Sequence, residues 1–332
     1  MNMKRALLTL AAALLLTPLA AQEKIIFDTD FGGDADDLGA LTILNNLEND
    51  GVCEITAIMV YSNYSDAIAA IDGVNRYYGN DGVPMAIRNH SYYDTETSYC
   101  NAVATTLPHE LTNDDVPLCI DLYREILSQA DDKSITLVTV GPLANIKELI
   151  DSKADKHSPL TGLELMNRKL KGISMMGGAF PAMENEWNFW GNSAGTTRYV
   201  LDKLATPIAI IGYEVGQAVK IGNEFNKIKG NNPLYPGFLY FSEHAPWMKA
   251  DFKGAILDNP CYDQITLLHG IYGDDHKGWE MVEGWRCVVE DNSATQWVED
   301  EKSNHRYMRV AKHPTRLRNE VRRLMMRDIK PD

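Results

Sequence analysis

The chain has 332 residues, of which 45% are hydrophobic and 23% are charged, so it can form one large α/β domain or two small ones. Its formal net charge of −14 argues against nucleic acid as a partner, because a protein that follows a phosphate backbone needs a basic face. The composition fits an acidic enzyme that acts on small neutral molecules.

Residues 1–21 have the pattern of a secretory signal peptide. Lys4 and Arg5 precede an apolar run, Ala6 to Leu16, and small residues follow it. The run is too short to span a membrane comfortably, and no later segment reaches about 18 consecutive apolar residues. We therefore expect an exported protein, periplasmic or secreted, whose mature chain is 22–332 and which has no membrane partner.

After this leader, short apolar runs alternate with segments of helical periodicity. Strands are predicted over Lys24–Phe27, Glu54–Tyr61, Val83–Ile87, Ile135–Val140, Gly172–Met176 and Pro207–Ile211. Helices are predicted from Asp36 onward and over Ala67–Tyr78, Val116–Gln129, Ala144–Ile150, Ala194–Leu204 and Tyr262–Tyr272. This alternation predicts a single α/β domain with an open, mostly parallel sheet and helices on both faces.

Two other features have structural interpretations. The basic stretch Arg306–Arg327 places Val321, Leu324 and Met325 on one apolar stripe, which favours an amphipathic surface helix over a nucleic-acid site. The spacing of the cysteines fits no zinc pattern, so we expect structural side chains at Cys53, Cys100, Cys119, Cys261 and Cys287.

A dense group of aspartates follows the first strand. Five carboxylates fall within ten residues, at Asp28, Asp30, Asp34, Asp36 and Asp37. Carboxylates this close repel one another unless a cation neutralises them, and oxygen-rich sites suit Ca²⁺ or Mg²⁺. The alternative is an acidic, solvated loop in which Asp36 caps the following helix. An EF-hand fits poorly, because no Glu occupies the twelfth position of the loop.

Residues 28–37, Asp-Thr-Asp-Phe-Gly-Gly-Asp-Ala-Asp-Asp, resemble the N-terminal motif of the nucleoside hydrolase family, Asp-x-Asp-x-Gly-x-Asp-Asp, with two residues more before the final pair. The resemblance implies that Asp30 is a general base and metal ligand and that Asp37 is a bidentate metal ligand. Asp36 matches the family's penultimate aspartate, which implies a contact with the substrate. The insertion leaves Asp34 as a further candidate.

Later segments resemble the family in the same order along the chain. They are Ser62-Asn63, Gly141-Pro142-Leu143-Ala144-Asn145, Met176-Gly177-Gly178, Glu186-Trp187-Asn188 and Tyr262-Asp263. The resemblance implies that the Val140 carbonyl and Asp263 complete the metal site. It also implies that Asn63, Glu186 and Asn188 hold the sugar. Each segment alone has a structural explanation; Asp263, for instance, could simply cap a helix.

The resemblance implies calcium-dependent hydrolysis of the N-glycosidic bond of a ribonucleoside or related riboside, with release of ribose and base. Tyr262 stands where the family has a histidine that some members use to protonate the leaving base, so Tyr262 is a further candidate site residue. Two alternatives stay open: a calcium-dependent sugar or nucleoside-binding protein without turnover, and a metal-dependent phosphohydrolase. The sequence determines neither the base nor the oligomeric state, and a homo-oligomer stays open.

Overall fold

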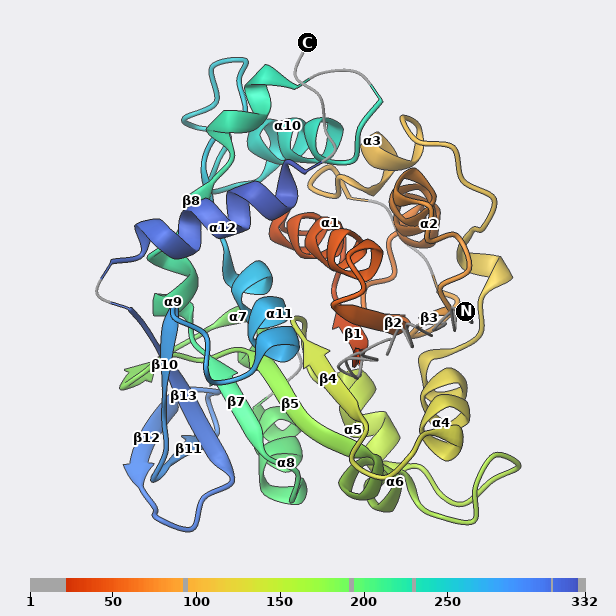
Figure 1. Cartoon of the computed structure of the whole chain (residues 1–332), viewed down its shortest axis with the longest axis vertical. Helices are drawn as coiled ribbons and strands as arrows, with labels where there is room; N and C mark the ends of the chain where they lie inside the picture. The colour runs from red at the N-terminus through yellow and green to blue at the C-terminus, as the bar shows by residue number, and fades with distance from the viewer. Residues whose placement is uncertain (1–21, 92–94, 191–193, 229–230, 312, 328–332) are drawn as a thin grey trace, which may run out of the picture.

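The computed structural model describes residues 22–91, 95–190, 194–228, 231–311 and 313–327 (Figure 1), and the expected signal peptide lies outside them. The strands are β1 Glu23–Thr29, β2 Cys53–Val60, β3 Met85–Ile87, β4 Ile135–Thr139, β5 Leu170–Met176, β6 Ala182–Met183, β7 Ile208–Ile211, β8 Lys220–Ile221, β9 Asn259–Pro260, β10 Trp279–Val282, β11 Trp285–Val289, β12 Thr295–Glu299 and β13 His305–Val310. The α-helices are α1 Asp36–Asn49, α2 Ala67–Tyr78, α3 Cys100–Ala104, α4 Cys119–Gln129, α5 Ala144–Asp151, α6 Gly162–Lys169, α7 Trp187–Trp190, α8 Ala194–Lys203, α9 Tyr213–Gln217, α10 Leu234–His244, α11 Tyr262–Tyr272 and α12 Thr315–Met325. Two short 3₁₀ helices cover Asn113–Asp115 and Asn223–Lys227.

The main sheet has eight strands in the order β10-β13-β7-β5-β4-β1-β2-β3. All neighbours pair in parallel except β10 and β13, which are antiparallel. The predicted mostly parallel α/β sheet is therefore confirmed. Among the described residues, no helix has the length and apolar character needed to cross a membrane.

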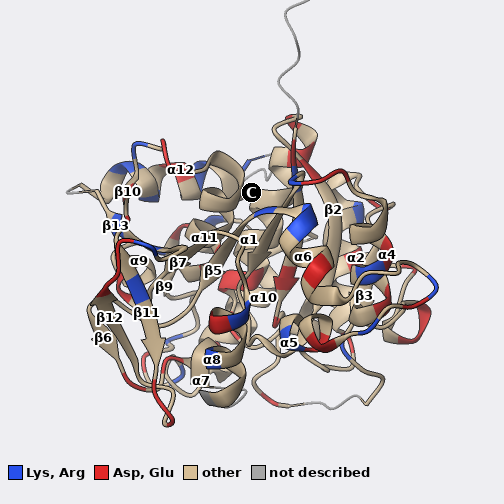
Figure 2. Ribbon diagram, turned by 90° about the horizontal axis from the view of Figure 1, so that it is seen from below, with Lys and Arg blue, Asp and Glu red and all other residues tan. Residues whose placement is uncertain are grey.

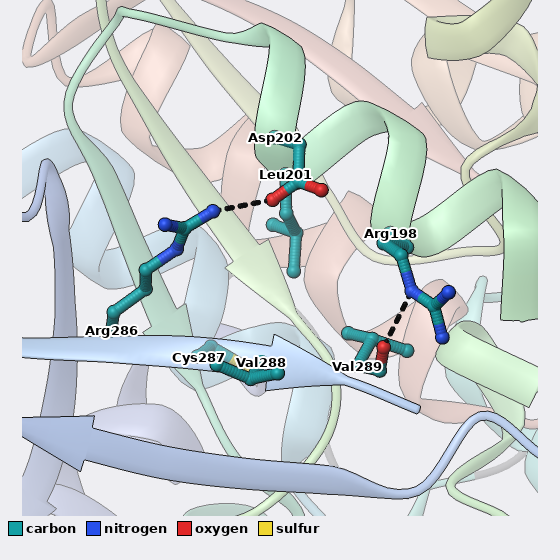
Figure 3. A pocket seen from close by; sticks show the side chains of 7 residues that line it. All are labelled: Arg198, Leu201, Asp202, Arg286, Cys287, Val288 and Val289. Carbon is teal, nitrogen blue, oxygen red and sulfur yellow. Dashed lines mark hydrogen bonds and ion pairs between the residues drawn. The ribbon is translucent and has the colours of Figure 1, made fainter. Parts of the chain in front are cut away.

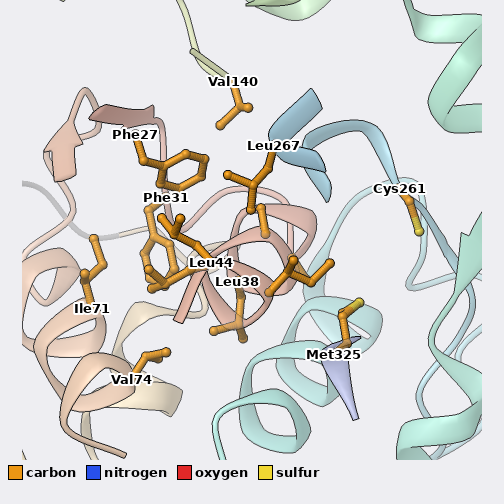
Figure 4. Packing of buried hydrophobic residues seen from close by; sticks show 14 of the residues in the cluster. Phe27, Phe31, Leu38, Leu44, Ile71, Val74, Val140, Cys261, Leu267 and Met325 are labelled. Atoms are coloured by element: carbon orange, nitrogen blue, oxygen red, sulfur yellow. The ribbon is translucent and has the colours of Figure 1, made fainter. Parts of the chain in front are cut away.

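Helices cover both faces of the sheet because the central strands are apolar on both sides. Ile25 and Phe27 of β1 belong to one buried cluster, which also contains residues of α1, α2, α11 and α12. Ile26 points to the other face, where it joins residues of α4, α5, α6 and α8. Figure 1 shows these two helical layers on either side of the sheet. In Figure 4, Leu38 and Leu44 of α1 pack near Phe27 and Phe31.

The C-terminal region is only partly helical, so the prediction of one helix over Arg306–Arg327 was wrong for its first part. His305–Val310 forms strand β13, which lies between β7 and β10 and buries Tyr307 and Met308. The amphipathic helix is α12, which buries Val321 and its apolar neighbours. The five cysteines are buried and free, which agrees with structural roles.

The sheet brings the candidate site segments to one edge. In parallel strands, the carboxyl ends lie on the same side, where open α/β sheets carry their ligands. Asp28 of β1 is opposite Thr139 of β4, and Thr139 is opposite Met175 of β5. The loops that follow β1, β4 and β5 therefore start side by side, and these loops carry most of the predicted residues.

A buried histidine makes the fold sensitive to acid. His305, at the start of β13, is 2% exposed, and its Nδ1 accepts a hydrogen bond from the Cys287 backbone N–H at 3.3 Å. Burial lowers the pKa of His305 below 6.5. A histidine whose pKa is lowered by folding contributes stability above the unfolded pKa, and this contribution is lost as the pH falls.

We predict that His305→Asn reduces the loss of stability between pH 7.5 and pH 5. Asparagine can still accept the Cys287 N–H through its side-chain oxygen, but it cannot take up a proton. Urea denaturation at both pH values measures this effect, with the exposed His313→Asn as the control. An equal pH dependence in wild type and His305→Asn would contradict it.

Candidate active site

The loop between β1 and α1 is held in a tight, buried conformation. Gly32 has φ +118°, and a Cβ there would lie 2.5 Å from the Cys100 sulfur and from the Tyr64 ring. The Gly32 N–H donates to the Tyr99 hydroxyl at 3.1 Å. Glycine is therefore required at this position, both for its backbone conformation and for lack of space. The loop directs the following aspartates toward the start of α11.

Three carboxylates meet at this point. Asp36 and Asp37 lie in the first turn of α1, and Asp263 lies in the first turn of α11. Each is at most 3% exposed, and one carboxylate oxygen of each lies within 4.8 Å of those of the other two. The Asp263 N–H donates to Asp36 at 3.3 Å, and the Thr29 hydroxyl donates to Asp37. We call Asp36, Asp37 and Asp263 the buried triad.

The triad is electrostatically unfavourable without a cation. Burial and neighbouring carboxylates raise the pKa values of Asp36 and Asp263 well above the ordinary range. Burial and the charge of Asp30 do the same for the pKa of Asp37. No cationic side chain is among the main influences on these three groups in the described part of the chain. Figure 2 shows acidic residues in the middle of the molecule as well as around its edge.

Asp30 lies beside the triad. Its charge raises the pKa values of all three triad residues, although its oxygens are not within the 4.8 Å group. A Cβ on Gly141 would lie 2.8 Å from the Asp30 backbone nitrogen and 3.0 Å from its Oδ1. The glycine after Val140 thus allows Asp30 to approach the end of β4. Burial raises the pKa of Asp30 to about 7. A hydrogen bond from the Trp187 side chain acts in the opposite direction and limits this increase.

The predicted metal ligand at residue 140 and the predicted sugar ligand at residue 188 contact each other. Asn188 Nδ2 donates to the Val140 carbonyl at 2.7 Å. A carbonyl oxygen has two lone pairs, so this bond leaves one acceptor position. Glu186 accepts from the backbone N–H groups of Gly178, Asn188 and Phe189, at 2.9, 3.0 and 3.1 Å. It therefore organises the loop after β5, and burial raises its pKa to about 7.

Asn63 and Tyr262 lie at the borders of the site. Asn63 Nδ2 donates to the Asn89 side chain at 2.8 Å, and its Oδ1 is buried without a hydrogen-bond partner. Tyr262 is half-buried, next to Asp263 at the start of α11. Burial raises the pKa of Tyr262, with a further contribution from Tyr213. Asp34 is held by Asn259, whose Nδ2 donates to it at 2.5 Å.

The structure gives supporting roles that the sequence did not indicate, one of them to Asp28 of the five clustered aspartates. The fully buried Asp28 accepts from the Tyr123 hydroxyl at 2.6 Å and from Asn145 Nδ2 at 3.1 Å. Asn145 is the last residue of the Gly-Pro-Leu-Ala-Asn segment, which follows β4. Through this hydrogen bond to Asp28, the segment also holds the end of β1 in place. The Thr29 hydroxyl likewise donates a hydrogen bond to the Asp37 carboxylate. Only the presence of consecutive polar residues, Asp28 and Thr29, after the apolar run of β1 could have indicated these roles.

The donor set of the acidic region fits a hard cation. The candidate ligands Asp30, Asp37, Asp263 and the Val140 carbonyl are all oxygen donors, with no histidine or cysteine among them. Such a set suits Ca²⁺ rather than Zn²⁺. The uncompensated negative charge of the buried triad gives a second, independent reason to expect a cation there.

Two cavities lie away from the aspartates. One has a volume of about 240 Å³ and lies between α8 and β11 (Figure 3). Its two arginines are already engaged: Arg286 pairs with Asp202 at 2.6 Å, and Arg198 Nε donates to the Val289 carbonyl at 2.7 Å. The other, of about 520 Å³, lies between α3 and α10. Neither is lined by a predicted site residue.

Comparisons with curated proteins give partial matches. Pyrimidine-specific ribonucleoside hydrolase RihA of Photobacterium profundum is 30% identical over 151 residues, which cover 43% of this chain and 45% of the relative. RihA of Shewanella sp. (strain ANA-3) is 28% identical over 173 residues, 49% of this chain and 50% of the relative. The chain thus spans about half the length of the curated relatives it matches.

Solved structures with the same fold cover nearly the whole chain. An inosine-guanosine nucleoside hydrolase has a TM-score of 0.64 at 16% identity and covers 91% of this chain and 98% of its own. The effector protein XOO4466 has a TM-score of 0.63 at 16% identity, covering 92% and 93%. The type III effector XopQ, solved with adenosine diphosphate ribose, has a TM-score of 0.59 at 15% identity, covering 92% and 93%. At these identities, the likeness shows the fold alone.

The family model described as inosine-uridine preferring nucleoside hydrolase matches residues 25–311. This range runs from β1 to the end of the main sheet and includes the acidic loop and Asp263. The chain therefore belongs to the inosine-uridine preferring nucleoside hydrolase family.

Proposed function

We propose that this protein hydrolyses the N-glycosidic bond of ribonucleosides or related ribosides in a calcium-dependent reaction that releases ribose and base. The observation that carries the proposal is the buried triad at the carboxyl-end edge of a sheet with this family's fold. Incubation with a panel of nucleosides, followed by an assay for free ribose, tests it. We also propose export, because residues 1–21 have the pattern of a signal peptide.

Asp37, Asp263, Asp30 and the Val140 carbonyl would hold the calcium ion. When bound, calcium would supply positive charge that makes a neighbouring water easier to deprotonate and that attracts ribose hydroxyls. Thr29 fixes the orientation of Asp37, and Asn188 fixes the Val140 carbonyl. The chain thus arranges the ligands before the ion arrives.

Asp30 is the proposed general base. It lies at the edge of the triad, next to the end of β4, and it is partly exposed. Its carboxylate would take a proton from water while the water oxygen bonds to the anomeric carbon. The C–N bond breaks, and its electron pair leaves with the base nitrogen. The transition state resembles an oxocarbenium ion, so nearby carboxylates also stabilise the developing positive charge.

The polar residues around the triad are suited to hold the sugar. Asp36 is the triad residue outside the ligand set that the family resemblance implies, and its oxygens would accept ribose hydroxyls beside the ion. Asn63 has a buried Oδ1 without a partner. Glu186 directly precedes α7 and Asn188 lies in it, beyond β5 and across the sheet edge from Asn63, and both would contact the sugar from that side.

The second candidate is a calcium-dependent nucleoside or sugar-binding protein without turnover. The observation that favours it is Tyr262, because burial raises the pKa of its phenol and makes it a poor acid. Ribose release separates the two functions. Binding of nucleoside without ribose release would establish the second.

Asp30→Asn should lower the rate of ribose release by roughly 10²–10⁴-fold, because it removes the proposed proton acceptor. Circular dichroism should show an unchanged fold, since asparagine has nearly the same shape. Asp121→Asn, at an exposed position on α4, is the matched control and should retain full activity. Near-wild-type activity in folded Asp30→Asn would remove Asp30 from the mechanism.

Calcium should stabilise the wild-type protein against heating, by about 2.7 kcal/mol at a concentration one hundred times Kd. Asp37→Asn should abolish this shift. It should also raise the Tm of the chelated protein, because one buried negative charge is removed from the triad. Differential scanning fluorimetry with EDTA, CaCl₂ and ZnCl₂ measures both effects. A shift of equal size in Asp37→Asn would exclude Asp37 as a ligand.

Ribonucleosides should be preferred over 2′-deoxyribonucleosides by roughly 10⁴–10⁵-fold in kcat/KM. Sites that bind a substrate hydroxyl reject the analogue that lacks it, because a buried polar group then loses its partner. The comparison uses inosine and 2′-deoxyinosine, or another active pair. If the ratio is within about tenfold, the acidic residues do not bind the ribose diol.

A further inference from the structure

The β1–α1 loop carries one carboxylate that the proposed ligand set does not use. Asp34 is half-buried, and it is the further aspartate in a loop that is two residues longer than the family motif. Its oxygens are not within the 4.8 Å group that Asp36, Asp37 and Asp263 form. Asp34 is therefore a neighbour of the buried triad rather than a member of it.

The charge of Asp34 acts on the whole acidic region. Besides burial, which has the largest effect, this charge raises the pKa values of Asp30 and of all three triad residues. In the part of the chain that the structure describes, no cationic side chain is among the main influences on Asp34 itself. The negative charge at this position is therefore uncompensated, like that of the triad.

A buried asparagine holds Asp34 and points to a ligand in the same place. Asn259 is 1% exposed, and its Nδ2 donates to Asp34 Oδ1 at 2.5 Å. An ionised carboxylate can only accept, so the amide nitrogen must be the atom that faces Asp34. The amide oxygen of Asn259 is buried and has no hydrogen-bond partner among the described residues. Such an oxygen is unfavourable unless a donor or a cation lies beside it.

The backbone fixes Asn259 close to the triad. Asn259 lies in β9 and pairs antiparallel with Ile221 of β8, shortly before α11 begins. The Asp263 N–H, in the first turn of α11, donates to Asp36 at 3.3 Å. The same stretch of chain therefore contacts the acidic loop twice, through Asn259 at Asp34 and through Asp263 at Asp36.

A purely structural role for Asp34 would be to stabilise the N-terminus of α1. The N-cap position is occupied by Ala35, and Asp34 Oδ1 accepts from the Asp36 N–H only at 3.3 Å. A carboxylate near a helix N-terminus stabilises the helix modestly. This role leaves the unpartnered Asn259 oxygen unexplained, whereas a cation beside Asp34 accounts for both the charge and the oxygen.

We propose that Asp34, positioned by Asn259, is an additional acidic arm of the cation site, outside the ligand set that the family resemblance implies, and that its charge increases the affinity for a multivalent cation. The assignment rests on the proposed function and extends it to the composition of the metal site. Hard cations bind more tightly where more negative charge surrounds their oxygen ligands. Groups that surround the ligands typically change metal affinity by roughly 10–100-fold.

Asp34→Asn removes the charge but keeps the shape and an oxygen that can accept from Asn259. Calorimetric titration of metal-free protein with CaCl₂ at low ionic strength should show roughly 10–100-fold weaker binding than in wild type. Coulomb energy is proportional to the charge of the ion, so a tenfold loss for Ca²⁺ corresponds to about a thirtyfold loss for Tb³⁺. Asp121→Asn on α4 changes the net charge equally and should alter neither affinity by more than about twofold.

Asn259→Leu tests the positioning role. Leucine has a similar volume but cannot donate to Asp34, so the calcium affinity should fall about three- to tenfold, the effect of one hydrogen bond. In an Asp34→Asn background, the same change should alter the affinity by less than about threefold, because Asn259 acts through the charge of Asp34. Equal effects in both backgrounds would show that Asn259 does not act through Asp34.

The melting temperature without a cation separates charge repulsion from a structural role. In EDTA, Asp34→Asn should raise the Tm, because one negative charge beside the triad is removed. A fall in the Tm would mean that Asp34 mainly stabilises α1, and it would overturn the proposal. A calcium affinity within about threefold of wild type, or equal fold losses for Ca²⁺ and Tb³⁺, would also overturn it.

These measurements do not depend on ribose release. If the wild-type protein binds calcium but releases no ribose, the proposed function fails, and the titrations of the Asp34 and Asp121 variants still decide the role of Asp34. If the wild-type protein binds neither Ca²⁺ nor Tb³⁺, the calcium dependence of the proposed function and the role of Asp34 are both overturned.

Discussion

Mutual repulsion among buried carboxylates is the constraint on which the active region depends. Two aspartates at the start of α1 and one at the start of α11 place their oxygens within 4.8 Å, with Asp30 close by. This arrangement alone does not stabilise the fold, because each buried negative charge makes it less favourable to ionise the next carboxyl group. The surrounding contacts fix these carboxylates rather than separate them: the Thr29 hydroxyl donates to Asp37, the Asp263 N–H donates to Asp36, and α1 packs on α11. The oxygen donors and the uncompensated charge of the buried triad suit a metal ion.

The order of the strands explains why distant segments share this neighbourhood. β1 lies between β4 and β2, and β5 follows β4, so the loops after these strands open at one edge. The bond from Asn188 to the Val140 carbonyl then connects the proposed metal ligand to the proposed sugar ligand. The Val140 carbonyl has only two lone pairs, so a change in metal binding at this oxygen is expected to change its hydrogen bond from Asn188, and the reverse. Metal binding and sugar binding are therefore expected to be coupled.

Much of this arrangement could be predicted from sequence because it depends on contiguous patterns. Buried strands followed by polar segments indicated the sheet and the edge where Asp30, Asn63 and Val140 lie. Strand β13 was missed, because its sequence His-Arg-Tyr-Met-Arg-Val is basic and leads into a true amphipathic helix. The Gln217 bond to Tyr262 could not be predicted, since it joins residues 45 positions apart through a five-residue helix. Side-chain pairings of this kind depend on packing that no local pattern records.

Tyr262 stands where the resemblance to the family implies a histidine, and this difference changes how the proposed reaction can stabilise a leaving group. A histidine near neutral pH can give up a proton, whereas a half-buried tyrosine whose pKa is raised keeps its own. A tyrosine can still donate a hydrogen bond, and such a bond is strongest when the acceptor gains negative charge, as a departing base does. In the proposed mechanism, the activation barrier to C–N bond cleavage therefore depends on the basicity of the leaving group, and it is lower for a less basic one. Ribosides of weakly basic, planar leaving groups are then the substrates for which a site with this chemistry is best suited.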